Sequence, residues 1–334
     1  MRRQLPHDRA LGSLRPGPHL PVLGPEMAIL RSPSRVPART GPVPEGLVQL
    51  RMPEVRFRFL DALWIQVTGT RCNIACRHCF SSCGPKADQI PMMSAGQVDE
   101  ALEEGRSLGM RQVYFTGGEP FLHPDLPRMV RAALRLAPLT IVTNGLLIDD
   151  RAVEMILEES RRTRYSLDLR VSLDGTTAEE NDRVRGRGTF EKVSETLRRL
   201  GRAGLSPLVA VVEHEGIVRA EARERFLQFL RDLGIARPRV QFQSLFRMGR
   251  EMRRTHGYHD LGVLASAPLL SEVESRLPCA TGRAVTSEGV YTCPMLVEHQ
   301  SARLGDALAK SLHPIRMNWD TCQTCMLDGL HGSN

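Results

Sequence analysis

The sequence predicts an α/β protein built on an open parallel sheet. From about residue 60 onward, strand-like and helix-like patterns alternate, and six strand–helix repeats can be counted if the connection after residue 246 is included. Alternation of this kind places the strands in parallel, with right-handed crossovers and the helices outside. Six units cannot close on themselves as eight units do, so the sheet is expected to stay open.

The expected elements follow one another with short connections. One helix starts after Ser94, with Gln97 in the capping-box position. Short apolar runs between the helical segments are typical of buried strands. The expected strands cover 64–68, 113–116, 139–143, 167–173, 207–212 and 240–246, and the expected helices cover 94–108, 124–136, 149–160, 190–203 and 219–233.

Length and composition limit the class of protein. A chain of 334 residues can bury one large core, or one core and a small appendage, and 41% of its residues are apolar. No apolar run approaches the roughly 18–20 residues of a membrane span, so no membrane partner is expected. Several of the eight cysteines have metal-like spacing and no secretory signal precedes them, which favours a reducing, cytoplasmic compartment.

The basic charge is concentrated at the N-terminus. Residues 1–58 hold ten arginines and four acidic residues, and so carry +6 of the net charge of +7. Only three of the 45 basic residues are lysine, a bias that favours a GC-rich genome over phosphate recognition, and nucleic acid is not expected as a partner. Nine of the 22 prolines lie in the first 50 residues, so 1–58 is expected to be a disordered extension. A transit peptide, or a start at Met27 or Met52, is the alternative.

Three cysteines lie close together directly after the first expected strand, where α/β sheets place their ligands. Cys72, Cys76 and Cys79 occur in the run T-R-C-N-I-A-C-R-H-C-F. This spacing lets one loop wrap a single metal cluster, and three ligands leave one iron of a four-iron cube open. Zinc sites usually pair two C-x2-4-C units, so the pattern favours iron–sulfur over a zinc knuckle or three unrelated buried cysteines.

A second motif, Gly117-Gly118-Glu119-Pro120, ends the second strand. With both motifs in this order, the chain resembles the radical S-adenosylmethionine (SAM) enzymes over about residues 60–330. Their pattern is C-x3-C-x-aromatic-C after the first barrel strand, with G-G-E-P after the second, and His78 takes the aromatic position. The resemblance implies an open, partial (β/α)6 TIM-like barrel over 59–250. It also implies a [4Fe–4S] cluster on the three cysteines, with SAM chelating the open iron.

The resemblance assigns further residues to SAM. The Gly117-Gly118 backbone would approach the methionine part closely because no Cβ intrudes, and Glu119 would accept from its ammonium group. The alternative for the glycines is an ordinary tight turn.

Two later strand ends, at Asn144 and Ser172, and an arginine about a dozen residues after Ser172 supply the other SAM candidates. Ser172 matches the serine of the family's S-x-D-G. Arg185 matches the arginine that pairs with the SAM carboxylate, although one extra residue in the spacing makes Arg183 a competitor. Asn144 is a further candidate, and Asp174 is expected to shape its turn.

Residues 251–334 are expected to form a small C-terminal domain. Between Cys279 and Cys293, the run 289–292 predicts a hairpin arm, and 304–306 is expected to start a helix. With Cys322 and Cys325, this segment resembles the twitch form of the SPASM domain, which holds an auxiliary [4Fe–4S] cluster. The chain lacks the further cysteines of a full SPASM domain, and a structural zinc ribbon is the alternative.

The resemblance implies reductive cleavage of SAM to a 5′-deoxyadenosyl radical that abstracts hydrogen from an unactivated C–H. One hypothesis is two-electron modification of a ribosomally made peptide, although 1–58 is too short and Pro-rich for a leader-binding domain. Another is oxidation of a small molecule or a protein side chain, and a third is a non-catalytic zinc scaffold or regulatory protein. A flavodoxin- or ferredoxin-type protein would donate electrons. Cys83 is a candidate hydrogen donor or acid, or simply a packed small residue.

Overall fold

The computed structural model of the chain describes residues 54–214, 217, 219–258, 274 and 277–328. All of them belong to one compact unit, Leu50–Asn334. Most of the expected disordered extension 1–58 lies outside the described residues. The boundaries expected at 58/59 and 250/251 therefore stay predictions.

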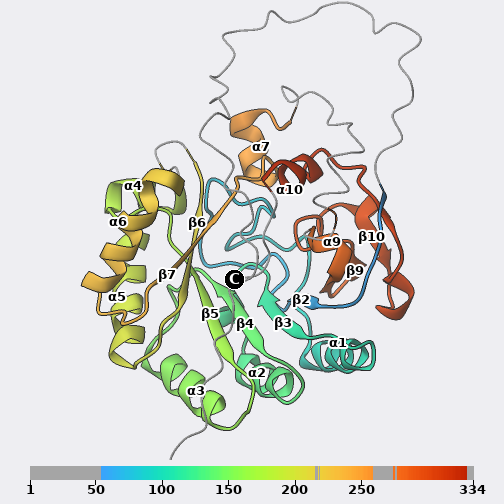
Figure 1. Cartoon of the computed structure of the whole chain (residues 1–334), viewed down its shortest axis with the longest axis horizontal. Helices are drawn as coiled ribbons and strands as arrows, with labels where there is room; N and C mark the ends of the chain where they lie inside the picture. Colours follow the sequence, from blue (N-terminus) through green and yellow to red (C-terminus); the bar gives the residue numbers. More distant parts are fainter. Residues whose placement is uncertain (1–53, 215–216, 218, 259–273, 275–276, 329–334) are drawn as a thin grey trace, which may run out of the picture. The chain divides into compact units, whose positions relative to one another are not determined.

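A nine-stranded sheet organises this unit (Figure 1), with the strand order β10-β9-β8-β2-β3-β4-β5-β6-β7. Seven neighbouring strands, from β8 to β7 in this order, are all parallel, and the six that come first in the sequence confirm the predicted open α/β arrangement. These six strands are β2 (Ala62–Gln66), β3 (Gln112–Thr116), β4 (Leu139–Thr143), β5 (Leu167–Ser172), β6 (Leu208–Val212) and β7 (Arg239–Gln243).

Helices connect the parallel strands and lie outside the sheet (Figure 1). The sequence predicted five of them, and a sixth, α4, was missed between β5 and β6. Its pattern is weak because Val184 is its only buried apolar residue. In the described part of the chain no helix is long and apolar enough to cross a membrane. The six helices are α1 (Ala95–Ser107), α2 (Leu126–Leu134), α3 (Asp150–Arg161), α4 (Ala178–Arg185), α5 (Thr189–Arg202) and α6 (Arg219–Asp232).

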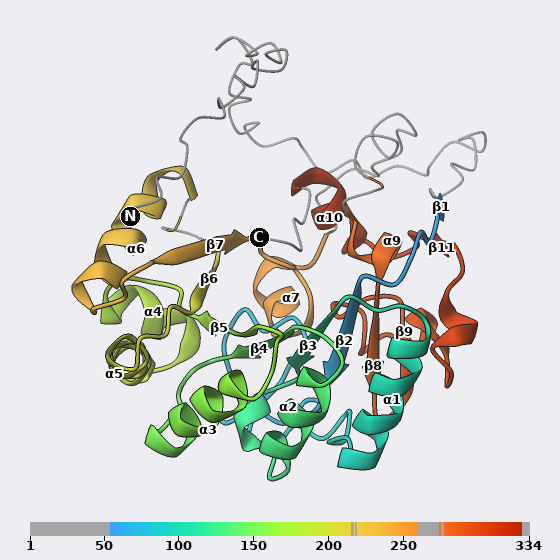
Figure 2. The ribbon, with the colours of Figure 1, turned by 60° about the horizontal axis from the view of Figure 1, so that its bottom comes forward.

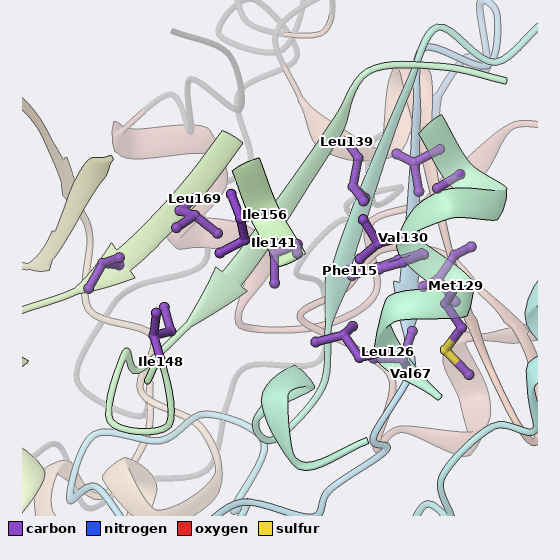
Figure 3. Packing of buried hydrophobic residues seen from close by; sticks show 14 of the residues in the cluster. Val67, Phe115, Leu126, Met129, Val130, Leu139, Ile141, Ile148, Ile156 and Leu169 are labelled. Carbon is purple, nitrogen blue, oxygen red and sulfur yellow. The ribbon is translucent and has the colours of Figure 1, made fainter. Parts of the chain in front are cut away.

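The main core lies between the sheet and these helices (Figure 3). Phe115 on β3 and Ile141 on β4 are fully buried, and in the close-up Phe115 lies against Val130 of α2 while Ile141 lies beside Ile156. Ile156 of α3 packs into the same cluster. Met129 and Val130 belong to an apolar face of α2 that packs on the sheet and also includes Leu126, Ala132, Ala133 and Leu134. This packing holds the carboxyl ends of β3, β4 and β5 in fixed positions.

The C-terminal segment extends the same sheet. After α9 (Pro278–Thr281), β8 (Gly282–Thr286) pairs in parallel with β2, and β9 (Gly289–Tyr291) returns antiparallel as the predicted hairpin. The expected helix start at 304–306 was wrong. That stretch is β10 (Arg303–Gly305), which pairs with β9, and Gly305 has a φ of +131° that a helix does not allow. A short 3₁₀ turn follows at Ala309–Ser311.

Two short helices beyond the barrel lie side by side in both overall views (Figures 1 and 2). They are α7 (Gly249–Thr255), after β7, and α10 (Cys322–Asp328). The hydroxyl of Tyr258 lies 2.7 Å from Thr324 Oγ1 in α10. A separate two-stranded sheet joins β1 (Glu54–Val55) to β11 (Ile315–Arg316). The last part of the chain therefore contacts both the segment that precedes β2 and the segment that follows α7.

The predicted capping box of α1 is present. The Ser94 hydroxyl accepts from the Gln97 N–H, and the Gln97 side chain accepts from the Ser94 N–H. Ser94→Ala is therefore expected to lower the free energy of unfolding by about 1 kcal/mol. Urea denaturation measures this, with Ser107→Ala as a control in the same helix because its hydroxyl donates only to the Glu104 carbonyl. An equal loss in both variants would contradict the capping role.

Candidate active site

A cavity of about 580 Å³ lies at the carboxyl ends of the parallel strands. It extends from these strand ends along the strands, where its walls include Trp64, Arg170 and Phe242. Most of the predicted site residues line it. These are Cys72, Cys76, His78, Cys79, Cys83, Gly117, Gly118, Asn144, Ser172 and Arg185.

Three groups of predicted residues do not line this cavity. Arg183 is absent from its walls, so of the two competing arginines only Arg185 faces it. Glu119 lies behind the wall. The four C-terminal cysteines are also outside it, although Pro278 and Pro294, next to Cys279 and Cys293, form part of its border.

The cysteine loop is held by an arginine from beyond the barrel. The Arg250 guanidinium donates to the carbonyl oxygens of Cys76 and Ser82, both at 2.8 Å, and to that of Cys83 at 2.5 Å. Gly249 makes this approach possible, because a Cβ there would lie 2.5 Å from the Phe80 carbonyl oxygen. The turn after β7 therefore fixes the loop's shape.

The Gly-Gly turn packs against the start of the same loop. A Cβ on Gly118 would lie 1.9 Å from the Arg71 carbonyl oxygen, which also accepts from the Glu119 N–H at 3.0 Å. Gly117 has a φ of +121°, which favours glycine. Contact between two protein loops is therefore reason enough for both glycines, apart from any approach of SAM.

An N–H group lies near each sulfur of Cys72, Cys76 and Cys79. Asn144 Nδ2 lies 3.6 Å from Cys72 Sγ, an Arg185 Nη1 lies 4.0 Å from Cys76 Sγ, and the Cys83 N–H donates to Cys79 Sγ at 3.3 Å. The hydrogen bond from the Cys83 thiol lowers the pKa of Cys79 to about 6, against the effect of burial. Burial raises the pKa of Cys72 to about 12 and that of Cys76 to about 11.

Asp174 is the centre of a buried charge network that the sequence did not predict. Its carboxylate is fully buried, with Oδ2 lying 2.6 Å from His78 Nε2 and 2.7 Å from Arg185 Nε. Its Oδ1 accepts from the Val212 N–H at 2.7 Å. Burial opposes its ionisation, but Arg185 and His78 outweigh that effect and hold the pKa of Asp174 well below its usual range. Its place at the end of β5 was the available signal.

Glu119 joins two strand ends beneath the cavity. Its carboxylate accepts from Thr143 Oγ1 at 2.7 Å, the Asn144 N–H at 2.8 Å and the Phe121 N–H at 3.1 Å. Burial raises the pKa of Glu119 to about 7, although these donors favour the ionised form. The carboxylate is thus engaged within the protein, and its predicted contact with SAM stays untested.

The C-terminal cysteines gather around a buried arginine. Burial raises the pKa values of Cys279, Cys293 and Cys322 to about 12. The pKa of each of these thiols is raised further by the charge of another of the three, so the three sulfurs lie close enough to interact electrostatically. Arg283 is fully buried beside them and donates only to carbonyl oxygens, including that of Cys279 at 2.7 Å. None of its partners among the described residues is a carboxylate.

Both sets of cysteines fit an anionic, thiolate-bound group. Thiolates need compensation when they are buried, and the donors around Cys72, Cys76 and Cys79 and the uncompensated Arg283 supply it. Among the described residues, no three His, Cys, Asp or Glu side chains form a ready-made site for a single metal ion. Cys72, Cys76 and Cys79 would hold the first group at the cavity, and Cys279, Cys293, Cys322 and Cys325 would hold the second.

The fold and the cavity define an α/β partial barrel with a cysteine loop at the strand ends. Residues 67–217 match the profile of the Radical SAM superfamily. This match assigns residues 67–217 to the superfamily, whose members use a [4Fe–4S] cluster and SAM.

Two curated relatives share about half of the chain. A GTP 3′,8-cyclase of Chlorobaculum tepidum is 32% identical over 161 residues, which cover 47% of this chain and 46% of that protein. The mycofactocin maturase MftC of Mycobacterium tuberculosis is 33% identical over 171 residues, which cover 50% of this chain and 40% of that protein. The chain thus spans less than half the length of these relatives.

Solved structures share the fold. Streptococcus suis SuiB bound to S-adenosylmethionine matches with a TM-score of 0.55 at 16% identity, over 72% of this chain and 62% of that one. The structure of anSMEcpe with bound AdoMet matches with a TM-score of 0.55 at 17% identity, over 79% of both chains. At these identities the likeness establishes the partial-barrel fold alone.

Asp174→Asn is expected to lower the free energy of unfolding by about 3–5 kcal/mol at pH 7, because it leaves the buried Arg185 without its anion. The folded pKa of Asp174 lies below the unfolded value of about 3.9, so its stabilisation is complete above that value and is lost as the pH falls through the folded pKa. The difference from wild type should therefore shrink below about pH 4. Urea unfolding at several pH values measures it.

The matched control is Asp99→Asn, which breaks an exposed ion pair with Arg128 and should cost less than about 1 kcal/mol. Equal losses in the two aspartate variants would contradict the central role of Asp174.

Arg250→Ala removes three charged hydrogen bonds from the cysteine loop. Since one such bond contributes about 1.5–3 kcal/mol, amide hydrogen exchange across residues 72–84 should become roughly 10- to 100-fold faster. Exchange measured by mass spectrometry tests this, with Arg253→Ala as the control on the exposed side of the same helix. Unchanged exchange in Arg250→Ala would mean that the loop holds its shape without this arginine.

Proposed function

We propose that this protein is a radical SAM enzyme that abstracts hydrogen from an unactivated C–H of a peptide substrate. The observation that carries the proposal is the cavity itself. It brings the three cysteines of C-x3-C-x2-C together with the Gly-Gly turn, Asn144 and Ser172, which come from four different strand ends, and with Arg185 at the end of α4. These are the positions that the family resemblance assigns to the cluster and to SAM.

When bound, a [4Fe–4S] cluster with one open iron supplies the electron that cleaves SAM to methionine and a 5′-deoxyadenosyl radical. The chain's own residues prepare the site for it. Asn144 and Arg185 direct N–H groups at the sulfurs of Cys72 and Cys76. Val142, Phe242 and Phe246 give the cavity apolar walls that exclude water and other hydrogen donors.

The second set of cysteines is proposed to hold an auxiliary [4Fe–4S] cluster that takes an electron from the substrate. Cys279 and Cys293 lie directly beside Pro278 and Pro294 of the cavity border, so such a cluster would be close to a bound substrate. A flavodoxin- or ferredoxin-type donor is proposed to reduce the first cluster. A zinc ion on the same four cysteines is the competing proposal for this second site.

A peptide substrate is supported by the relative MftC, a maturase, at 33% identity. SuiB, which shares the fold, has been solved bound to its precursor peptide SuiA. The GTP 3′,8-cyclase relative favours a small-molecule substrate instead, and a cavity of about 580 Å³ is within the range of small-ligand sites. Oxidation of a small molecule is therefore the second candidate.

The deciding experiment is anaerobic reconstitution, followed by counting iron and zinc per chain and assaying 5′-deoxyadenosine after SAM and dithionite are added. About eight irons with deoxyadenosine formed would support both clusters. About four irons and one zinc would keep the radical chemistry and make the second site structural. Zinc alone, without deoxyadenosine, would leave a non-catalytic metal-binding protein.

Two cysteine variants separate the two sites. Cys76→Ala is expected to abolish 5′-deoxyadenosine formation and to lower the iron content by about four atoms per chain, because it removes one of three cluster ligands. Cys322→Ala is expected to spare SAM cleavage and stop product formation, with a similar loss of iron. Chromatography of the nucleoside products and metal analysis test both. Unchanged deoxyadenosine in Cys76→Ala would defeat the radical SAM assignment of this cysteine, and full turnover by Cys322→Ala would remove the second site from the mechanism.

A further inference from the structure

The lower part of the cavity contains a buried arginine whose charge is not matched. Arg170 comes from the middle of β5, lines the cavity and is only 6% exposed. Its Nη2 donates to Gln241 Oε1, and its Nε has no hydrogen-bond partner. Among the described residues, no carboxylate forms an ion pair with it. Asp168 is near enough to raise the pKa of Arg170, but Arg239 already binds that carboxylate at 2.6 and 2.9 Å.

A guanidinium in this position is costly for the free protein. Removing it from water penalises the charged form, which is why burial lowers the pKa of Arg170. The cost is offset when an anion with good geometry approaches the free N–H. A cation of this kind on the wall of a ligand cavity is therefore placed to receive a negative group from a ligand.

The strand register puts this arginine below the residues proposed for SAM. Arg170 pairs with Val142, whereas Ser172 lies two residues further toward the rim, next to the Asn144 that follows β4. At roughly 3.3 Å per residue, the two layers are about 7 Å apart along the strand. The SAM carboxylate is proposed to meet Arg185 at the rim, so Arg170 is left for a second ligand.

A second unpartnered group lies in the same cavity. Gln66, at the end of β2, is 3% exposed, and its Oε1 has no hydrogen-bond partner. This amide oxygen can accept an N–H from a ligand. Nearby, Trp64 stacks on Tyr114 with ring centroids 3.9 Å apart and adds a flat wall to the cavity. Together these groups fit one carboxylate, one N–H donor and an apolar stem.

We propose that Arg170 binds a carboxylate of the substrate, namely an Asp or Glu side chain or the C-terminal carboxylate of a peptide. The inference rests on the proposed function and names the chemistry of its substrate. One unpartnered guanidinium N–H, at Nε, beside a buried cationic charge matches a single planar carboxylate. A phosphate group would carry about −2 at neutral pH and needs more donors than Arg170 offers.

The test compares acids with their amides on the reconstituted enzyme. The probes are fluorescein-labelled seven-residue peptide pools with random flanking residues, acetylated and amidated, whose central residue is Asp or Glu in one pool and Asn or Gln in the other. A third pool has a neutral centre and a free C-terminal carboxylate. Glutarate and glutaramide form a small-molecule pair. Fluorescence anisotropy measures peptide binding, and calorimetry measures the small pair.

We expect an acid pool to bind at least about tenfold more tightly than the amide pool, which corresponds to about 1.4 kcal/mol. Arg170→Gln should remove this preference, and Arg170→Lys should keep part of it because the charge remains. Arg164→Gln, at an exposed position just before β5, is the matched control and should keep the whole preference. Iron content and circular dichroism show that each variant is folded.

The binding results distinguish the carboxylate site from the peptide function. Equal binding of acid and amide pools, or a preference that survives in Arg170→Gln, would overturn the carboxylate site and leave the peptide function standing. An Arg170-dependent preference for glutarate, with no peptide pool binding, would support the site and overturn the peptide substrate. If Arg170→Gln weakens SAM binding and no acid is preferred in wild type, Arg170 pairs with SAM itself and the inference is lost.

Discussion

The buried carboxylate of Asp174 is the interaction on which the geometry of the candidate active site depends. It contacts His78 of the cysteine loop, Arg185 at the end of α4 and the backbone of Val212 at the end of β6. One ionised group therefore fixes three segments that are far apart in the sequence. Because the whole network is buried, loss of the anion leaves Arg185 with an uncompensated charge, which is more costly than loss of a surface pair.

The barrel and the C-terminal segment are joined by direct contacts. The short stretch after β7 holds the cysteine loop through Arg250 and reaches α10 through Tyr258, whose hydroxyl lies 2.7 Å from Thr324 Oγ1. Thr324 sits between Cys322 and Cys325 in the sequence. Residues 249–258 therefore contact both the cysteine loop and the helix that carries Cys322 and Cys325. β8 adds a second connection, since it extends the barrel sheet directly beside β2.

The sequence was sufficient for whatever is encoded by periodicity or by short motifs. The six parallel strands, the Ser94 capping box and the hairpin arm at 289–292 were predicted, and the two motifs around Cys72 and Gly117 located the cavity. Contacts between distant segments could not be predicted. Nothing in the run around Arg250 indicates that it binds carbonyls 167 to 174 residues away.

One network that the sequence did not predict and one wrong prediction have physical causes. Asp174 follows a strand, where Asp commonly shapes a turn, and its burial by His78 and Arg185 is visible only in three dimensions. The stretch 304–306 resembles a helix start because an Asp follows a Gly, but pairing with β9 decides its conformation. For the Gly-Gly turn, the structure adds the neighbouring Arg71 carbonyl as a constraint on Gly118, and the approach of these glycines to SAM stays a prediction.

The charges around the cysteines point to coupling between cofactor loading and folding. Arg170, Arg185, Arg250 and Arg283 bring four positive charges into buried or half-buried positions, and of these only Arg185 has a carboxylate partner in the described part of the chain. Burial meanwhile holds most of the thiols in their neutral form, with pKa values of about 11 to 12. Thiolate ligands bound to metal would supply the missing negative charge near Arg250 and Arg283 and release the thiol protons. The site is therefore better balanced electrostatically when it is loaded, and metal binding should contribute directly to the stability of the folded chain.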